Sequence, residues 1–256
     1  MTPASAPQLW VVVPAHNEAA GIGATLDALA AQTDTSFGLV VVDNASTDGT
    51  ADVAREFGAN APFRVDIVAE PVRGPGPAAD TGFRHAIGEG AALLARTDAD
   101  CLPAPDWVAA VKAALGRAEM ACGRSVPRWD EHPNLAERRL LPAVTRLAGL
   151  CGRYRPAHRH RRYLTPYVLC HGHNIAITAD LYLRCGGTPR VAPGGPAEDL
   201  GLVNRAREHS TLVVRAEHMV VGHSLRRLRA WGARRTLLWY WDRRYAPPGP
   251  AAMDVR

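Results

Sequence analysis

Two aspartates separated by one residue, Asp98 and Asp100, follow a short apolar run that ends at Ala95. Carboxylates at this spacing can share a hard divalent cation, such as Mg²⁺ or Mn²⁺, with the phosphate oxygens of a substrate. The cation would offset the negative charge on a departing diphosphate. An isolated Asp-x-Asp pair is more often part of a turn or a helix cap, so its meaning depends on the elements that position it.

Two further polar segments carry groups that could bind a nucleotide. The segment 14–18, with sequence PAHNE, follows one apolar run, and Asp43 follows another. Asp43 can accept a hydrogen bond from a base N–H, and Glu18 can accept one from a ribose hydroxyl. The simpler interpretation of each segment is local: a turn after a strand and a cap for the next helix.

Strands alternate with helices along the first half of the chain. Short apolar runs predict buried strands at 9–13, 37–42, 65–68, 91–95 and 120–122, and helical spacing predicts helices at 21–31, 46–57, 78–89 and 106–115. This alternation indicates a mostly parallel α/β sheet. Ligands bind such sheets outside the carboxyl ends of the strands. Because all three polar segments lie at such ends, we expect them to form one acidic crevice.

The second half is less regular. We predict a helix at 135–150, a basic and aromatic surface loop at 153–167, strands at 212–214 and 219–221, and a helix rich in arginine and tryptophan at 224–245. Residues 246–256 are expected to be a disordered tail.

Composition narrows the class of protein. The 256 residues are enough for one large domain, and the formal net charge is +5 with a pI of about 9.2. Lys112 is the only lysine, and the many arginines suit bidentate contacts with phosphate or carboxylate. The five cysteines form no Cys-x-x-Cys pair, so we expect neither a disulfide framework nor structural zinc, and a cytoplasmic location. Neither a signal peptide nor a transmembrane helix is expected.

Three segments, taken together, resemble the family 2 glycosyltransferases. They are VVVPAHNEAAGIGATLDAL, LVVVDNASTDGTADVA and ARTDADCLPAPDWV, and they occur in the family's order and spacing. The resemblance implies a GT-A fold, an α/β sheet flanked by helices with a helical C-terminal part. It implies a single catalytic domain over residues 1–256, in which about 9–125 bind the nucleotide sugar and about 126–245 bind the acceptor.

The resemblance also implies roles for individual residues. Asp100 would bind Mg²⁺ or Mn²⁺ directly, and His223 would be a second ligand to the same metal. Asp98 would touch the ribose, or the metal through water. Donor contacts would come from Pro14, His16, Asn17, Glu18, Asp43, Ser46, Arg73, Gly76 and Asp98.

Glu198 and Asp199 resemble a Glu-Asp pair in which the aspartate is the general base of an inverting transfer. A carboxylate within hydrogen-bond reach of an acceptor hydroxyl can take its proton. The glycine- and proline-rich segment 188–196 before this pair could close over a donor. The local interpretation is that both acids favour the first turn of a helix.

The family lines its acceptor site with the segment that matches 171–174 here. This implies acceptor contacts for His173 and Asn174, with Glu198 near them. Alternatively, the histidines at 171 and 173 could chelate a metal.

Departures from the family pattern narrow the activity further. Asp80 and Thr81 stand where an Arg-Asn pair is common, which leaves the donor contacts there open. No convincing Gln-x-x-Arg-Trp motif or membrane span occurs, which argues against a processive polysaccharide synthase. Three alternatives to an inverting glycosyltransferase stay open: a retaining transferase acting on a glycerate-type acceptor, a nucleotidyltransferase, and a non-catalytic nucleotide-sugar-binding module.

The expected partners are a UDP- or GDP-sugar and an acceptor that is lipid-linked or small, with no nucleic acid. The loop 153–163 and the helix 224–245 have three interpretations: a solvated arginine face, a peripheral membrane contact anchored by Trp231, Trp239 and Trp241, or a homodimer contact.

Overall fold

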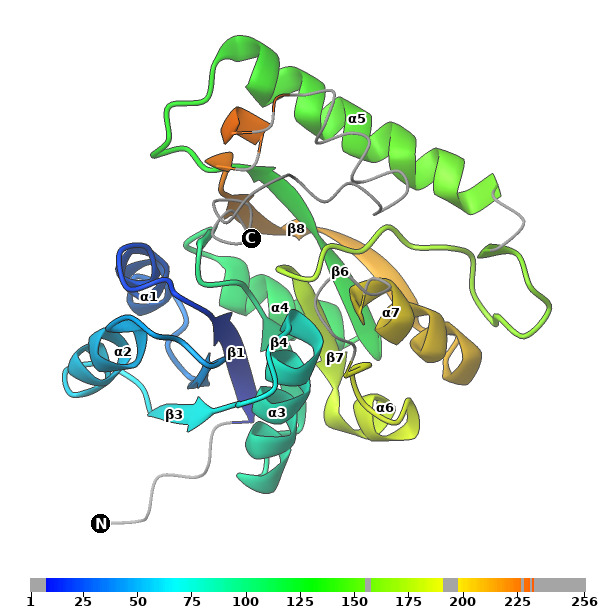
Figure 1. Cartoon of the computed structure of the whole chain (residues 1–256). Helices are drawn as coiled ribbons and strands as arrows, with labels where there is room; N and C mark the ends of the chain where they lie inside the picture. The colour runs from blue at the N-terminus through cyan, green and yellow to red at the C-terminus, as the bar shows by residue number, and fades with distance from the viewer. Residues whose placement is uncertain (1–7, 155–157, 191–197, 227, 231, 233–256) are drawn as a thin grey trace.

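The structure, a computed structural model, describes residues 8–154, 158–190, 198–226, 228–230 and 232. Its centre is a sheet of eight strands in the order β3-β2-β1-β4-β7-β6-β8-β5 (Figure 1). The strands β1 (Leu9–Ala15), β2 (Gly38–Asp43), β3 (Val65–Ala69) and β4 (Leu93–Arg96) are parallel. The predicted α/β sheet is therefore confirmed.

The helices α1 (Ile22–Ala30), α2 (Thr50–Gly58) and α3 (Pro75–Gly88) connect these four strands. The chain runs outward from β1 to β3 and then returns to β4 on the other side of β1. The strand order reverses at this point, which opens a crevice beyond the carboxyl ends of β1 and β4. The three predicted polar segments end β1, β2 and β4, so they lie along this crevice.

Helices cover both faces of the sheet. Neighbouring residues of a strand point to opposite faces, so each buried strand contributes side chains to both layers of the core. Val11 and Val13 pack with α1 and with Trp107 of helix α4 (Trp107–Leu115) on one face. Val12 packs with Phe83 of α3 on the other face, together with helices α6 (Ala179–Arg184) and α7 (Glu198–His209). Each fully buried side chain of this size contributes roughly 1.5–3 kcal/mol by leaving water.

The second half completes the sheet in a way that the sequence predicted only in part. The strands β5 (Cys101–Pro103) and β7 (Ile175–Thr178) were not predicted, and β6 (Met120–Pro127) is longer than predicted. The prediction of two strands at 212–214 and 219–221 is wrong, because β8 (Val213–His223) is continuous. An irregularity in its pairing with β6, between Gly123 and Arg124, accommodates the extra residues. Helix α5 (Leu135–Tyr154) lies along the outside (Figure 1).

Several predicted features lie partly or wholly outside the described residues. They are the loop closure proposed for 188–196, most of the helix 224–245 with its three tryptophans, and the tail 246–256. In the ranges that the structure describes, none of the helices combines the length and the apolar character needed to cross a membrane.

Candidate active site

Two non-glycine residues in the left-handed region form the turns after β1 and β2: Asn17 (φ 54°) and Ala45 (φ 55°). This conformation costs an L-residue roughly 1–2 kcal/mol and persists where neighbouring groups hold it. Ser46 Oγ accepts a hydrogen bond from the Asn17 N–H (3.1 Å), and Asn17 Oδ1 accepts one from the Thr47 N–H (2.8 Å). Asp43 Oδ1 accepts from the Ser46 N–H (3.2 Å). The structure therefore brings Asn17, Asp43 and Ser46 together, as the donor prediction requires.

His16 connects these turns to the loop that follows β3. Its Nδ1 lies 2.7 Å from the Asn44 carbonyl oxygen, and its Nε2 lies 2.6 Å from Arg73 Nη2. The buried Asn44 side chain donates to the Glu70 carbonyl oxygen (2.9 Å) and accepts from the Gly74 N–H (2.8 Å). Asn44 thus fixes the loop that carries the exposed Arg73, a role that its position after Asp43 did not reveal.

Asp98 is held by Arg96, which sequence reasoning missed. Arg96 is only 3% exposed; its Nε lies 3.0 Å from Asp98 Oδ1, and its Nη1 lies 3.5 Å from Glu198 Oε1. Burial raises the pKa of Asp98 and that of Glu198, against the attraction of Arg96. One buried cation therefore joins the donor half of the crevice to the start of α7. An arginine two residues before the first aspartate was the only sequence signal.

Asp100 and Glu18 share a second arginine that sequence reasoning missed. Arg226 Nη2 lies 2.7 Å from Glu18 Oε1 and 3.0 Å from Asp100 Oδ2. Burial raises the pKa of Glu18, although Arg226 opposes the shift. Burial also disfavours the Arg226 cation, but the two carboxylates outweigh this and raise its pKa above the ordinary value. Arg226 therefore bridges the ends of β1 and β4.

His223 pairs with Cys101, the residue after Asp100, because β5 and β8 are antiparallel neighbours. His223 Nδ1 lies 2.8 Å from the Val126 carbonyl oxygen and 2.9 Å from Ser125 Oγ. A carbonyl only accepts hydrogen bonds, so Nδ1 carries a proton. A histidine that binds a metal through its other nitrogen makes the same kind of hydrogen bond.

Three imidazole rings stand in a row behind this position. His171 stacks on His173 with 5.4 Å between ring centroids, and His173 stacks on His223 at 5.6 Å. Ser125 Oγ lies 2.7 Å from His173 Nε2 and so contacts two of the three rings. Burial, together with the nearby Arg215 and His223, lowers the pKa of His171 to about 3. His173 thus lies next to His223, and its predicted acceptor contact stays a prediction.

Asp199 lies in the first turn of α7, and its Oδ2 accepts a hydrogen bond from the Gly172 N–H (3.1 Å). This bond joins the predicted base to the segment that precedes β7. Glu198 of the same turn reaches Arg96, as described above. The expected first-turn placement of both acids is confirmed.

Two residues that were predicted to contact ligands are buried. Asn174 is 0% exposed and donates to the Arg124 and Met219 carbonyl oxygens (both 2.9 Å), while its Oδ1 accepts from Trp107 Nε1 (2.9 Å). Because its polar atoms are used inside the protein, the predicted acceptor contact of Asn174 is wrong. Gly76 is also buried, and a side chain there would collide with the Pro189 carbonyl oxygen, whereas its predicted donor contact stays a prediction.

Pro14 pairs with β2 near the end of β1 and is half-buried.

Asp80 and Thr81, which replace the family's Arg-Asn pair, face inward. Asp80 accepts from Tyr182 Oη (2.7 Å), and both residues contact Arg190. Arg190 also pairs with Glu70 at 2.8 Å. The departure from the family pattern thus builds an internal polar network that holds the chain before residue 191.

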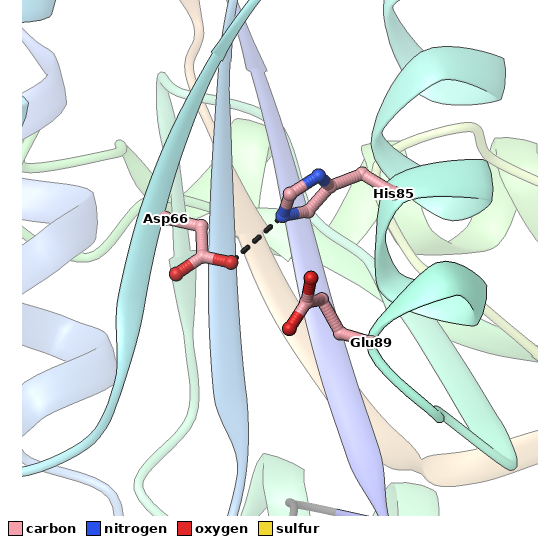
Figure 2. Close-up of side chains that lie close together, drawn as sticks. All are labelled: Asp66, His85 and Glu89. Atoms are coloured by element: carbon pink, nitrogen blue, oxygen red, sulfur yellow. Dashed lines mark hydrogen bonds and ion pairs between the residues drawn. The ribbon is translucent and has the colours of Figure 1, made fainter.

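Among the residues that the structure describes, one group of three could place its ligand atoms around a metal, and it lies elsewhere. Figure 2 shows His85 of α3, and Glu89 directly after that helix, reaching towards Asp66 on β3. Arg64 already pairs with Asp66 (2.8 Å) and with Glu89 (2.7 Å), and His85 Nε2 lies 2.7 Å from Asp66 Oδ2. These groups neutralise one another, so we interpret the cluster as an ion-pair network that fixes α3 on the sheet.

Comparison of the sequence with known proteins identifies relatives of this chain. A validoxylamine A glucosyltransferase from Streptomyces hygroscopicus subsp. jinggangensis is 38% identical, and the match covers 79% of this chain and 52% of that protein. Glycosyltransferase AglE from Haloferax volcanii is 34% identical over 104 residues, which is 40% of this chain and 33% of AglE. The chain thus spans a third to about half of the length of these curated relatives.

A solved structure has the same fold over nearly the whole chain. The mannosyltransferase PcManGT from Pyrobaculum calidifontis, in complex with GDP-Man and Mn²⁺, matches with a TM-score of 0.64 and 25% identity, covering 99% of this chain and 69% of that one. The expected GT-A fold is confirmed. The model of "Glycosyl transferase family 2" matches residues 10–176, more than half of the sequence. The chain therefore belongs to glycosyl transferase family 2.

Proposed function

We propose that this protein transfers a sugar from a UDP- or GDP-sugar to an acceptor hydroxyl, with Mg²⁺ or Mn²⁺ as cofactor. The observation that carries the proposal is the position of Asp100, which shares Arg226 with Glu18 at the end of β1 and directly precedes Cys101, the residue paired with His223. The GDP-Man and Mn²⁺ bound to PcManGT support the same chemistry for this chain.

The groups present fit a divalent cation. Mg²⁺ and Mn²⁺ accept one or two carboxylates, and Mn²⁺ also accepts an imidazole, with phosphate and water filling the remaining positions. Asp100 would supply the carboxylate, and His223, whose Nδ1 donates to the Val126 carbonyl oxygen, would supply an imidazole. When bound, the metal offsets charge on the departing nucleoside diphosphate.

The donor nucleoside would lie against the two tied turns. Asp43 retains an oxygen for the base, and Arg73 at the rim places a cation beside the loop that Asn44 holds. Arg226 pairs with the proposed metal ligand, since its Nη2 lies 3.0 Å from Asp100 Oδ2. We infer that Arg226 turns from Asp100 and Glu18 towards the diphosphate when the donor arrives, because phosphate oxygens pair well with a guanidinium.

Asp199 would act as the general base of an inverting reaction. Its carboxylate is fixed by the Gly172 N–H, and a proton taken from the acceptor hydroxyl would reside on this carboxylate. Arg96 would act as a positioning residue, because it holds Asp98 and Glu198 without being exposed to substrate. A retaining transfer is the alternative, and NMR of the product decides between them: inversion at the anomeric carbon supports Asp199 as base, and retention refutes that role.

The donor and the metal are tested together by a thermal-shift screen of nucleoside diphosphates with and without Mn²⁺. We expect UDP or GDP to stabilise the protein more in the presence of Mn²⁺. Asp100→Asn should abolish this metal-dependent gain and donor turnover. The exposed Asp27 provides a matched control, and Asp27→Asn should leave both unchanged. Metal-dependent donor hydrolysis that survives in Asp100→Asn would refute the metal assignment.

A further inference from the structure

A cavity of about 370 Å³ opens beside α7, on the acceptor half of the molecule. It is built mainly by the basic and aromatic stretch between α5 and β7, whose role the donor site does not explain. Figure 1 shows this stretch running next to α7, and the Leu164 N–H donates to the Arg207 carbonyl oxygen (2.7 Å). The lining residues are Arg153, His158, Arg159, His160, Tyr163, Leu164, Thr165, Pro166, Tyr167 and Arg207.

The inner wall of this cavity is a buried arginine without a described carboxylate partner. Arg207 is 1% exposed, and its guanidinium donates to the carbonyl oxygens of His158 and Thr165 (2.8 and 2.9 Å) and to Asn204 Oδ1 (2.9 Å). All these partners are neutral, so they satisfy its N–H groups without balancing its charge. Burial lowers the pKa of Arg207, as expected for a cation that lacks an anion. A bound anion would supply the missing charge.

The outer wall adds cations and no acid. Arg153, Arg159 and His160 are exposed at the cavity, and none of the described lining residues is an aspartate or a glutamate. The nearby acid Glu208 pairs with Arg162 instead (2.9 Å). Cations gathered on one concave surface focus a positive potential that attracts anions.

Aromatic rings make the cavity more than a patch of charge. Arg207 lies 4.1 Å from the centroid of the Tyr163 ring, and His158 stacks on Tyr167 at 4.2 Å with 14° between the planes. The carbonyl of Gly152 lies 2.8 Å from His158 Nδ1 and fixes the ring. These contacts preorganise the walls, and His158, Tyr163 and Tyr167 line the cavity while half-buried.

The cavity lies within reach of the proposed base. Asp199 and Arg207 belong to the same helix, eight residues apart, which corresponds to about 12 Å along the axis. The segment 167–172 leads from the cavity wall to Gly172, whose N–H donates a hydrogen bond to Asp199. We infer that a molecule with its hydroxyl at Asp199 could place a charged group in this cavity, about 12 Å away along the helix.

We propose that this cavity binds the phosphate group of a phosphorylated acceptor. This inference rests on the proposed function, because it identifies the chemical class of the acceptor. The phosphate could belong to a soluble sugar phosphate or to the headgroup of a lipid, and the cavity chemistry is the same for both.

The test measures phosphate binding without the donor. Isothermal titration of the full chain with inorganic phosphate and with glucose 6-phosphate forms one arm, and co-sedimentation with phosphatidate vesicles forms the other. The double variant Arg153→Gln/Arg159→Gln should weaken binding about tenfold or more, since each lost charge-assisted contact contributes on that scale. Arg161→Gln is the control, because the exposed Arg161 lies in the same loop but does not line the cavity.

Binding in either arm that falls in the double variant and holds in the control supports the site, and the responding arm identifies the source of the phosphate. The proposal is overturned if the wild type binds in neither arm, or if the control loses as much as the double variant. Arg207→Met tests the inner wall, with circular dichroism to verify folding. Stabilisation by nucleoside diphosphate and Mn²⁺ should be equal in all folded variants. Failure of that readout in the wild type would count against the proposed function and not against the phosphate site.

Discussion

Replacement of Asn174 by alanine tests whether this residue positions the site or contacts the acceptor. Its side chain makes three hydrogen bonds, to the carbonyls of Arg124 and Met219 and from the indole of Trp107. These bonds join α4, β6 and β8 beneath the histidine row. The substitution removes all three at once and leaves two fully buried partners, Trp107 and Met219, without these bonds.

The magnitude follows from those partners. Each net hydrogen bond contributes about 1 kcal/mol, and an indole N–H left buried without a partner costs a further 1–3 kcal/mol or so. We therefore expect Asn174→Ala to lower the free energy of unfolding by about 4–6 kcal/mol. In a protein of this size, that corresponds to a drop in Tm on the order of 10 °C.

Urea unfolding measures the loss in stability, and acceptor KM at 15 °C measures any loss of contact. The exposed Asn60 provides the control, and Asn60→Ala should change stability by no more than about 0.5 kcal/mol. We expect the folded fraction of Asn174→Ala to keep an acceptor KM near the wild-type value. A stability loss below about 1 kcal/mol, combined with a large rise in acceptor KM, would refute the positioning role.

Three other substitutions have definite expected outcomes. Burial lowers the pKa of folded His171 to about 3, so the unfolded chain binds a proton first and stability falls as the pH drops below about 6.5. His171→Gln should make the free energy of unfolding, measured in urea, less dependent on pH in that range, by at most about 1.4 kcal/mol per pH unit. Gly76→Ala should destabilise by about 1–3 kcal/mol through collision with Pro189, whereas Gly23→Ala, at an open helical position, should be neutral or stabilising by urea unfolding. Arg226→Gln should weaken binding of nucleoside diphosphate with Mn²⁺ by roughly tenfold in calorimetry, and unchanged affinity would contradict its phosphate role.

Local patterns were sufficient for the first half of the fold. The valine runs of β1 and β2 are buried on both faces, so continuous apolar sequence identified them as parallel strands. In contrast, β5 has only three residues and includes Pro103, and β7 lies between β4 and β6 through pairings that no local pattern reports. The middle of β8 carries Glu217 and His218, both exposed, and this polar interruption suggested two strands in place of one.

Candidate site residues could be recognised from the sequence only where the motif that contains them is local. Asp100 and Asp199 follow recognisable neighbours, but the partners of Arg96 and Arg226 come from elements up to 208 residues away in the chain. Asn174 shows the converse error: the segment matched a ligand-binding region, yet Trp107 and the carbonyls around it take every bond. Tertiary contacts decided these assignments, and the sequence carried no direct signal for them.

The double contact of Arg96 has a consequence for the order of events during turnover. One positive charge is divided between Asp98, a proposed donor contact, and Glu198, a proposed acceptor contact. When a cation and a nucleotide neutralise Asp98, more of the attraction of Arg96 becomes available to Glu198, and the reverse holds when the acceptor engages Glu198. The two substrates should therefore assist each other's binding, and thermodynamic reciprocity requires the factor to be the same in both directions.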